Sequence, residues 1–121
     1  MKQEVFVKFQ NPIKNLNELK VSVDYQKGGM NYFNGSMEQG GIYVYLTPTE
    51  RTQYGFRTII SGDKREMGFK ILVRPLGRKS QKAIEEVFNK INQNELLEKV
   101  ANYFEQERYS DIVRIIKGTV C

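Results

Sequence analysis

The chain has 121 residues, of which 40% are hydrophobic and 12% aromatic, a composition typical of a globular domain and not of a disordered segment. Nineteen basic residues against 14 acidic ones give a net charge of +5, which favours an anionic partner. The sequence has no histidine and one cysteine, Cys121, so histidine-dependent catalysis, the usual zinc sites and an internal disulfide are excluded.

The first part of the chain shows the two-residue alternation of β-strands. Residues 4–9 place Val5, Val7 and Phe9 on one side and Phe6 and Lys8 on the other. Asn11-Pro12 is expected to end this strand. Residues 19–26 alternate most clearly, so both segments are predicted to be strands of a half-buried sheet.

Glycine pairs divide the middle of the chain. Gly28-Gly29 predicts a turn, residues 30–33 a short strand, and Asn34-Gly35 a hairpin turn. Gly40-Gly41 precedes a predicted strand over residues 42–47. Two more strands are predicted over residues 56–61 and 67–74, and Pro75 is expected to end the sheet because it cannot donate a ladder hydrogen bond.

The periodicity becomes helical at Ser80, which is a favoured helix N-cap residue. One apolar stripe runs from Ile84 to Ile91 and a second runs from Leu96 to Phe104, and the spacing leaves open whether they belong to one bent helix or to two. Ser110 is predicted to cap a last short helix, with Gly118 as its C-cap.

Strands first and helices last predict an α+β fold. We expect an antiparallel sheet of four to six strands over residues 4–74, followed by two or three C-terminal helices over residues 80–117 packed on one face. Residues 1–121 are expected to form a single α+β domain. The sequence has neither a signal-peptide pattern at its start nor an apolar run of roughly 20 residues, so we expect a cytoplasmic protein.

The positive charge is concentrated in residues 57–82. This segment has eight basic residues and two acidic ones, a net charge of +6, and its basic residues are Arg57, Lys64, Arg65, Lys70, Arg74, Arg78, Lys79 and Lys82. Such a concentration usually indicates a polyanionic partner, most often nucleic acid. The Gly77–Lys82 stretch lacks the glycine spacing of a P-loop, so we expect phosphate-backbone contact there and not nucleotide hydrolysis.

The alternation also predicts a polar sheet face opposite the core. Its predicted members are Lys20, Tyr43, Tyr45, Arg57, Lys70 and Arg74. Tyrosine rings stack on bases while lysine and arginine contact phosphates, a combination that suits single-stranded nucleic acid. The alternative is a solvated face whose tyrosines serve strand packing.

Other side chains indicate less. Tyr32 and Phe33 lie between two glycine turns, where aromatics either anchor a protein partner or fold back and become buried. No two carboxylates are spaced for acid–base catalysis, so we expect no enzyme, no cofactor and no metal ion.

Two blocks of sequence resemble short proteins found in gut Bacteroides phages and mobile elements. The blocks are VDYQKGGMNYFNG at residues 23–35 and GIYVYLTPTER at residues 41–51. This resemblance implies an accessory protein of a phage or mobile element, a class that commonly binds nucleic acid or disables a host defence protein. The order of strands then helix also looks like that of the single-stranded-DNA-binding transcriptional coactivator family, whose sheet and helix dimerise, although the additional C-terminal helices depart from that plan.

The sequence therefore predicts a small non-enzymatic protein that binds nucleic acid, with single strands favoured. Its predicted contact residues are Tyr43, Tyr45, Arg57, Lys70, Arg74, Arg78, Lys79 and Lys82. The alternative is a phage or mobile-element accessory that binds and inhibits a host defence protein, with Tyr32 and Phe33 as its protein contacts. A homodimer is left open.

Overall fold

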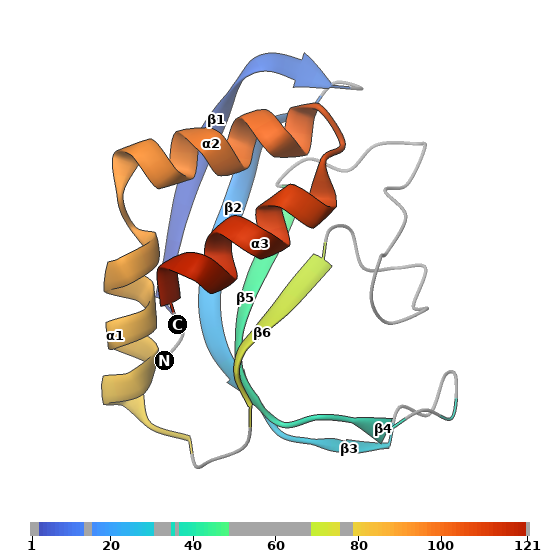
Figure 1. Ribbon diagram of the computed structural model, residues 1–121, viewed down its shortest axis with the longest axis vertical. Helices are drawn as coiled ribbons and strands as arrows, with labels where there is room; N and C mark the ends of the chain where they lie inside the picture. The colour runs from blue at the N-terminus through green and yellow to red at the C-terminus, as the bar shows by residue number, and fades with distance from the viewer. Residues whose placement is uncertain are drawn as a thin grey trace.

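The computed structural model describes residues 3–13, 16–30, 35, 37–48, 69–75 and 79–120. Four strands form an antiparallel sheet in the order β1-β2-β5-β6, and β3 and β4 form a separate two-stranded ladder (Figure 1). The strands are β1 (Gln3–Ile13), β2 (Leu16–Gln26), β3 (Gly29–Met30), β4 (Met37–Glu38), β5 (Gly41–Pro48) and β6 (Phe69–Pro75). The helices are α1 (Gln81–Ile91), α2 (Asn94–Glu105) and α3 (Tyr109–Val120). The predicted α+β fold, an antiparallel sheet followed by C-terminal helices, is confirmed.

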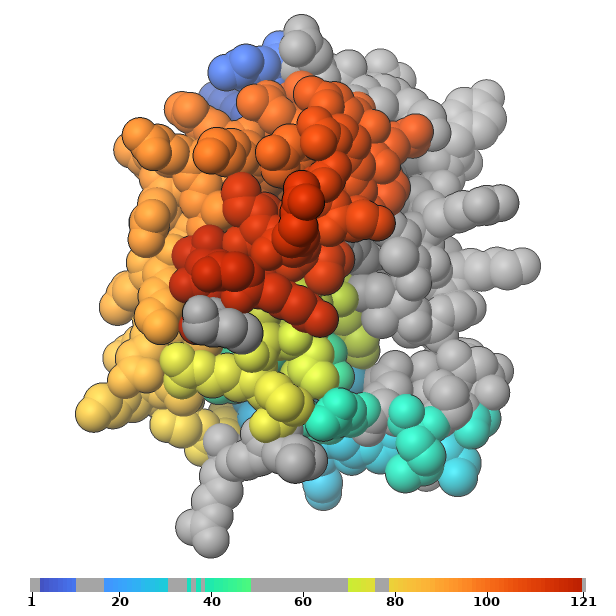
Figure 2. Space-filling view, viewed as in Figure 1, coloured from blue at the N-terminus to red at the C-terminus, as the bar shows by residue number. Residues whose placement is uncertain are grey.

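The three helices lie on one face of the four-stranded sheet. Figure 1 shows α2 and α3 crossing in front of the strands and α1 to the left of β1, and the contacts join α2 to β1, α1 to β1 and β2, and α3 to β6. From the same side, the space-filling view shows the helices hiding much of the sheet (Figure 2). The sheet therefore has one face that the helices cover and one face that they do not.

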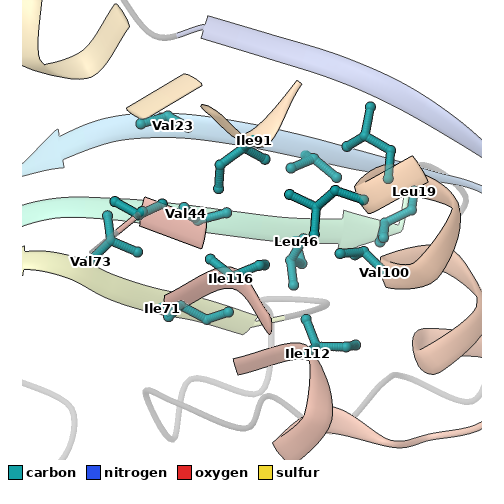
Figure 3. Close-up of a cluster of buried hydrophobic side chains, with 14 of the residues drawn as sticks. Leu19, Val23, Val44, Leu46, Ile71, Val73, Ile91, Val100, Ile112 and Ile116 are labelled. Atoms are coloured by element: carbon teal, nitrogen blue, oxygen red, sulfur yellow. The ribbon is translucent and has the colours of Figure 1, made fainter. Parts of the chain in front are cut away.

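The hydrophobic core fills the space between the helices and the sheet. Val21, Val23, Val44 and Leu46 alternate along β2 and β5 and are fully buried. They meet the apolar stripes of the helices, among them Ile91, Val100, Ile112 and Ile116 (Figure 3). Because every second strand residue faces the helices, the alternation in the sequence selects this face as the core.

The first strand is longer than the sequence predicts. Asn11-Pro12 was expected to end it, but β1 continues to Ile13. The ladder with β2 is irregular between Lys8 and Ile13, and β1 is an edge strand in the described sheet, so a proline without an N–H removes no central hydrogen bond. The predicted strand at residues 56–61 and most of that at 30–33 lie outside the described residues.

The residues at the helix ends confirm the predicted start of α1 and contradict the predicted ends of α3. Ser80 is the N-cap of α1, and its side-chain oxygen accepts a hydrogen bond of 3.3 Å from the Ala83 backbone N–H, as predicted. Asn92 ends α1, so the two apolar stripes belong to two helices. The prediction for α3 is wrong at both ends, because the helix already includes Ser110 and continues through Gly118.

Among the described residues, no helix has the length and apolar character needed to cross a membrane.

Candidate nucleic-acid interface

The face of the sheet opposite the helices is built from the alternate residues of the same four strands. The ladder places Tyr45 between Ser22 of β2 and Lys70 of β6, and places Thr47 beside Lys20. Phe6 of β1 is the other neighbour of Lys20. We call this the open face. Its described members are Glu4, Phe6, Lys8, Glu18, Lys20, Ser22, Asp24, Gln26, Tyr43, Tyr45, Thr47, Lys70 and Leu72.

Tyr43 and Tyr45 are neighbours on this face, with ring centroids 6.1 Å apart, but their environments differ. Tyr43 is only 7% exposed, its hydroxyl donates a hydrogen bond to the Gln39 carbonyl, and the Lys70 ammonium lies 5.1 Å from its ring centroid. A ring covered to this extent has no free side for a nucleic-acid base. Of the two predicted stacking residues, only the partly exposed Tyr45 retains accessible surface.

Tyr45 and Lys70 are held together by Gln26. The side-chain oxygen of Gln26 accepts hydrogen bonds from the Tyr45 hydroxyl at 3.0 Å and from the Lys70 ammonium at 2.9 Å. These contacts join β2, β5 and β6 and fix a cation beside an aromatic ring. This is the pairing of charge and ring that the sequence predicted for residues 45 and 70.

A hollow lies next to Tyr45. It has a volume of about 190 Å³ and is lined by Lys20, Ser22, Asp24, Tyr45 and Thr47. The lining offers one ammonium group, one carboxylate and three hydroxyl groups. Asp24 already accepts a hydrogen bond of 2.8 Å from the backbone N–H of Tyr25. The hollow therefore presents hydrogen-bonding groups next to apolar surface.

Arg74 does not join the open face as predicted. In the ladder Tyr43 pairs with Leu72, whereas Ile42 pairs with Arg74, so Val73 is an extra residue in β6. This bulge shifts the side-chain alternation by one position and turns Arg74 towards the helices. There its guanidinium lies 3.4 Å from the Glu86 carboxylate of α1, and both side chains are substantially exposed.

The remaining predicted cations fall into two groups. Lys79 and Lys82 are exposed at the start of α1, where Lys79 precedes the N-cap residue and Lys82 follows it. Arg57 and Arg78, together with the predicted protein contacts Tyr32 and Phe33, lie outside the described residues. The structure thus divides the described basic residues of segment 57–82 between the open face, with Lys70, and the end of the molecule where β6 leads to α1.

The open face itself is balanced in charge. Its described residues include three lysines and three acidic residues, namely Lys8, Lys20, Lys70, Glu4, Glu18 and Asp24. The excess positive charge of the chain is therefore not located on the described part of this face. Any electrostatic attraction must come chiefly from basic residues outside the described part of this face, such as Lys79 and Lys82.

Phe6 is a further aromatic residue on this face, and no function was predicted for it from the sequence. Phe6 is 52% exposed and lies opposite Lys20 in the ladder. A large aromatic at the outward position of an alternating strand was the available signal. Phe6 adds a second accessible ring to the face that holds Tyr45.

No group of three or more metal-binding side chains occurs within the described ranges. Comparisons of the chain with protein-family models, curated proteins and solved structures found no match. A functional assignment therefore depends on the geometry of the chain itself.

Proposed function

We propose that this chain is a small non-enzymatic protein that binds single-stranded nucleic acid on the open face of its sheet. The observation that supports this most directly is Tyr45, which shares the Gln26 oxygen with Lys70 and lines the hollow together with Lys20. It combines a ring that is partly exposed with two cations on a face that the helices leave uncovered.

The features of the face fit an unpaired strand better than a duplex. Exposed rings bind the flat faces of unstacked bases, which a duplex hides inside its helix. Phe6 and Tyr45 supply such rings on β1 and β5. The hydroxyl and carboxylate groups of the hollow then hydrogen-bond to base edges that are free only in a single strand.

Phosphate contacts in this proposal come from cations on and around the face. Lys20 and Lys70 contact phosphates beside the rings, and Lys79 and Lys82 extend the contacts towards α1. Arg57 and Arg78 belong to the same basic segment. Arg74 lies on the helix side of the sheet beside Glu86, so it is not one of these contacts.

Fluorescence anisotropy with short labelled single and double strands at two salt concentrations tests the proposal. Four phosphate contacts on a single strand, from Lys20, Lys70, Lys79 and Lys82, predict a slope of log K against log salt of about −2.8, or a loss of roughly 50-fold between 50 and 200 mM salt. Single strands should bind more tightly than duplexes of equal length. Absent binding, or binding that salt does not weaken, contradicts the proposal.

Paired lysine variants locate the interface. Lys70→Gln and Lys20→Gln each remove one phosphate contact and should weaken binding several-fold and reduce the salt slope by about 0.7. Lys99→Gln, which removes the same charge from an exposed position on α2, is the matched control and should bind as the wild type does. Equal losses in all three variants point to general charge attraction and contradict a specific open-face site.

A second candidate function is binding to a host protein, and one observation favours it. Met30 and Met37 are cross-strand partners in the β3–β4 hairpin and are 57% and 73% exposed. Figure 1 shows this hairpin extending away from the helices at the far end of β2 and β5. Adjacent exposed methionines are typical of adaptable protein-binding surfaces.

Recovery of a partner from host lysate, with and without nuclease treatment, distinguishes the two candidates. A partner that survives nuclease and is lost in the Met30→Ser/Met37→Ser variant supports protein binding through the hairpin. A partner that disappears with nuclease and is retained by this variant supports nucleic-acid binding. The double substitution changes only exposed side chains, so the fold should be unaffected.

A further inference from the structure

The first strand forms an edge of the sheet. Among the described residues, β1 pairs with β2 and with no other strand. Residues 3–8 are in continuous register with β2, so this part of the edge is regular. A regular edge strand presents backbone N–H and C=O groups that can pair with another strand.

The open-face side chains of this edge are arranged symmetrically about Phe6. Glu4 lies two residues before Phe6 and Lys8 two residues after it, and all three side chains are exposed. In an antiparallel pair of β1 strands centred on Phe6, the two Phe6 rings are neighbours. Glu4 of each chain then lies directly opposite Lys8 of the other, so both charged pairs are attractive.

The helix-facing side chains match in the same register. Val5 of one chain lies opposite Val7 of the other, and the reverse pair is identical. Both valines are only partly buried in the single chain and pack against its core. Pairing of two edges therefore continues the apolar layer while the charged pairs form on the other side of the sheet.

We propose that a second copy of this chain docks on β1, in antiparallel register about Phe6, to form a two-fold symmetric dimer in which the four described sheet strands of each copy join into one continuous sheet. The self-complementary order Glu4–Phe6–Lys8 favours a second copy over an unrelated strand, because a two-fold interface requires each patch to match itself. The open faces of both copies then lie on the same side of one sheet. This inference does not depend on nucleic-acid binding.

Lys8 also has a neighbour within its own chain. Glu18 of β2 lies opposite it in the ladder. In the dimer Lys8 is therefore flanked by Glu18 of its own chain and by Glu4 of the second copy. A single cation between two carboxylates makes reversal of the charge at residue 8 especially unfavourable.

Light scattering and sedimentation across a concentration series that reaches hundreds of micromolar test the dimer by charge exchange. The wild type should reach twice the 14.1 kDa of one chain. Glu4→Lys and Lys8→Glu each place two like-charged pairs across the interface and should weaken dimerisation at least tenfold. The double variant Glu4→Lys/Lys8→Glu restores the opposite pairs and should recover dimerisation relative to either single variant. The substituted side chains are exposed, but residue 8 also faces Glu18 of its own chain, so circular dichroism must first show that each variant is folded.

Cross-linking provides a second readout of the register. In a Cys121→Ser background, Phe6→Cys places two thiols opposite each other on the symmetry axis, within the separation that a disulfide spans. Oxidation should convert most of the protein to a covalent dimer. Met37→Cys in the same background is the control, because residue 37 is exposed but lies on the hairpin and should cross-link much more slowly.

These experiments distinguish a specific β1 dimer from a monomer and from a dimer formed elsewhere. A wild type that stays monomeric over the whole series overturns the proposal, as does a dimer that neither single charge reversal weakens. Efficient cross-linking at residue 6, together with recovery in the double variant, supports it. These experiments contain no nucleic acid, so a negative result does not affect the proposal of nucleic-acid binding, which the anisotropy measurements test separately.

Discussion

The two faces of the sheet use alternate residues of the same strands and differ in almost every property. On the helix-covered face, Val21, Val23, Val44 and Leu46 have no exposed surface. On the open face, Lys20, Tyr45 and Lys70 are partly exposed and take part in polar contacts or line the hollow. The covered face supplies the packing that stabilises the fold, whereas the open face keeps polar side chains with accessible surface.

Tyr43 shows that position on the open face does not by itself mean exposure. It is as buried as several core residues, although it points away from the helices. Its hydroxyl is satisfied by the Gln39 carbonyl, and its ring contacts Lys70. Tyr43 therefore supports the open face, while its neighbour Tyr45 retains accessible surface and is the ring that we propose for binding.

The largest expected effect compares one aromatic residue from each face. Phe104 is fully buried, stacks on Phe9 with ring centroids 5.7 Å apart, and meets Tyr109 edge to face. Phe104→Ala should lower the free energy of unfolding by about 3–5 kcal/mol. Tyr45→Ala should cost about 1 kcal/mol, because it removes a partly exposed ring. Urea unfolding measures both, and equal losses would contradict the division of roles between the faces.

The next effect concerns the bulge in β6 that places Arg74 on the helix side of the sheet. Gly41 has φ +150°, and a Cβ at this position would clash with the carbonyl oxygen of Arg74. Gly41→Ala should therefore destabilise the protein by about 2–3 kcal/mol. Gly118→Ala in α3 is the control, since open space surrounds that Cβ, and it should stabilise the helix by roughly 0.5–1 kcal/mol. A tolerated Gly41→Ala would mean that the strand register at the bulge is wrong.

The smallest effect is a pH dependence in the helical layer. Burial, with a smaller contribution from the Glu107 carboxylate, raises the pKa of the Tyr109 hydroxyl above its usual value of 10.0. The folded state therefore favours the neutral phenol, and stability should fall as the pH rises above 10 through the pKa of the folded state. Tyr109→Phe should remove this part of the alkaline loss of stability. An identical alkaline profile for the variant and the wild type would contradict it.

Local patterns in the sequence predicted the parts of the fold that depend on local chemistry. Alternation identified β2, β5 and β6, and the hydroxyl of Ser80 identified the start of α1. Gly118 was wrongly predicted to be the C-cap of α3, because packing further along the chain, and not the glycine, decides where this helix ends. In this fold α3 continues to Val120, which is buried in the core.

The candidate site was predicted only in part, because its arrangement depends on contacts between distant residues. Lys70 and Tyr45 were expected to be neighbours, and the ladder places them opposite each other. The bulge at Val73, which removes Arg74 from the face, has no signature in the sequence around it. The burial of Tyr43 likewise depends on the Gln39 carbonyl and on the position of Lys70, which alternation does not encode.

The most direct test of binding on the open face is a nuclear magnetic resonance titration of isotope-labelled protein with a short single-stranded oligonucleotide. Binding on the open face should produce shift changes centred on Lys20, Tyr45 and Lys70, with smaller changes at Lys79 and Lys82 and none at the exposed residues of α2. Changes confined to the helices, or an unchanged spectrum at saturating oligonucleotide, would contradict the claim that the uncovered face of the sheet is the binding surface.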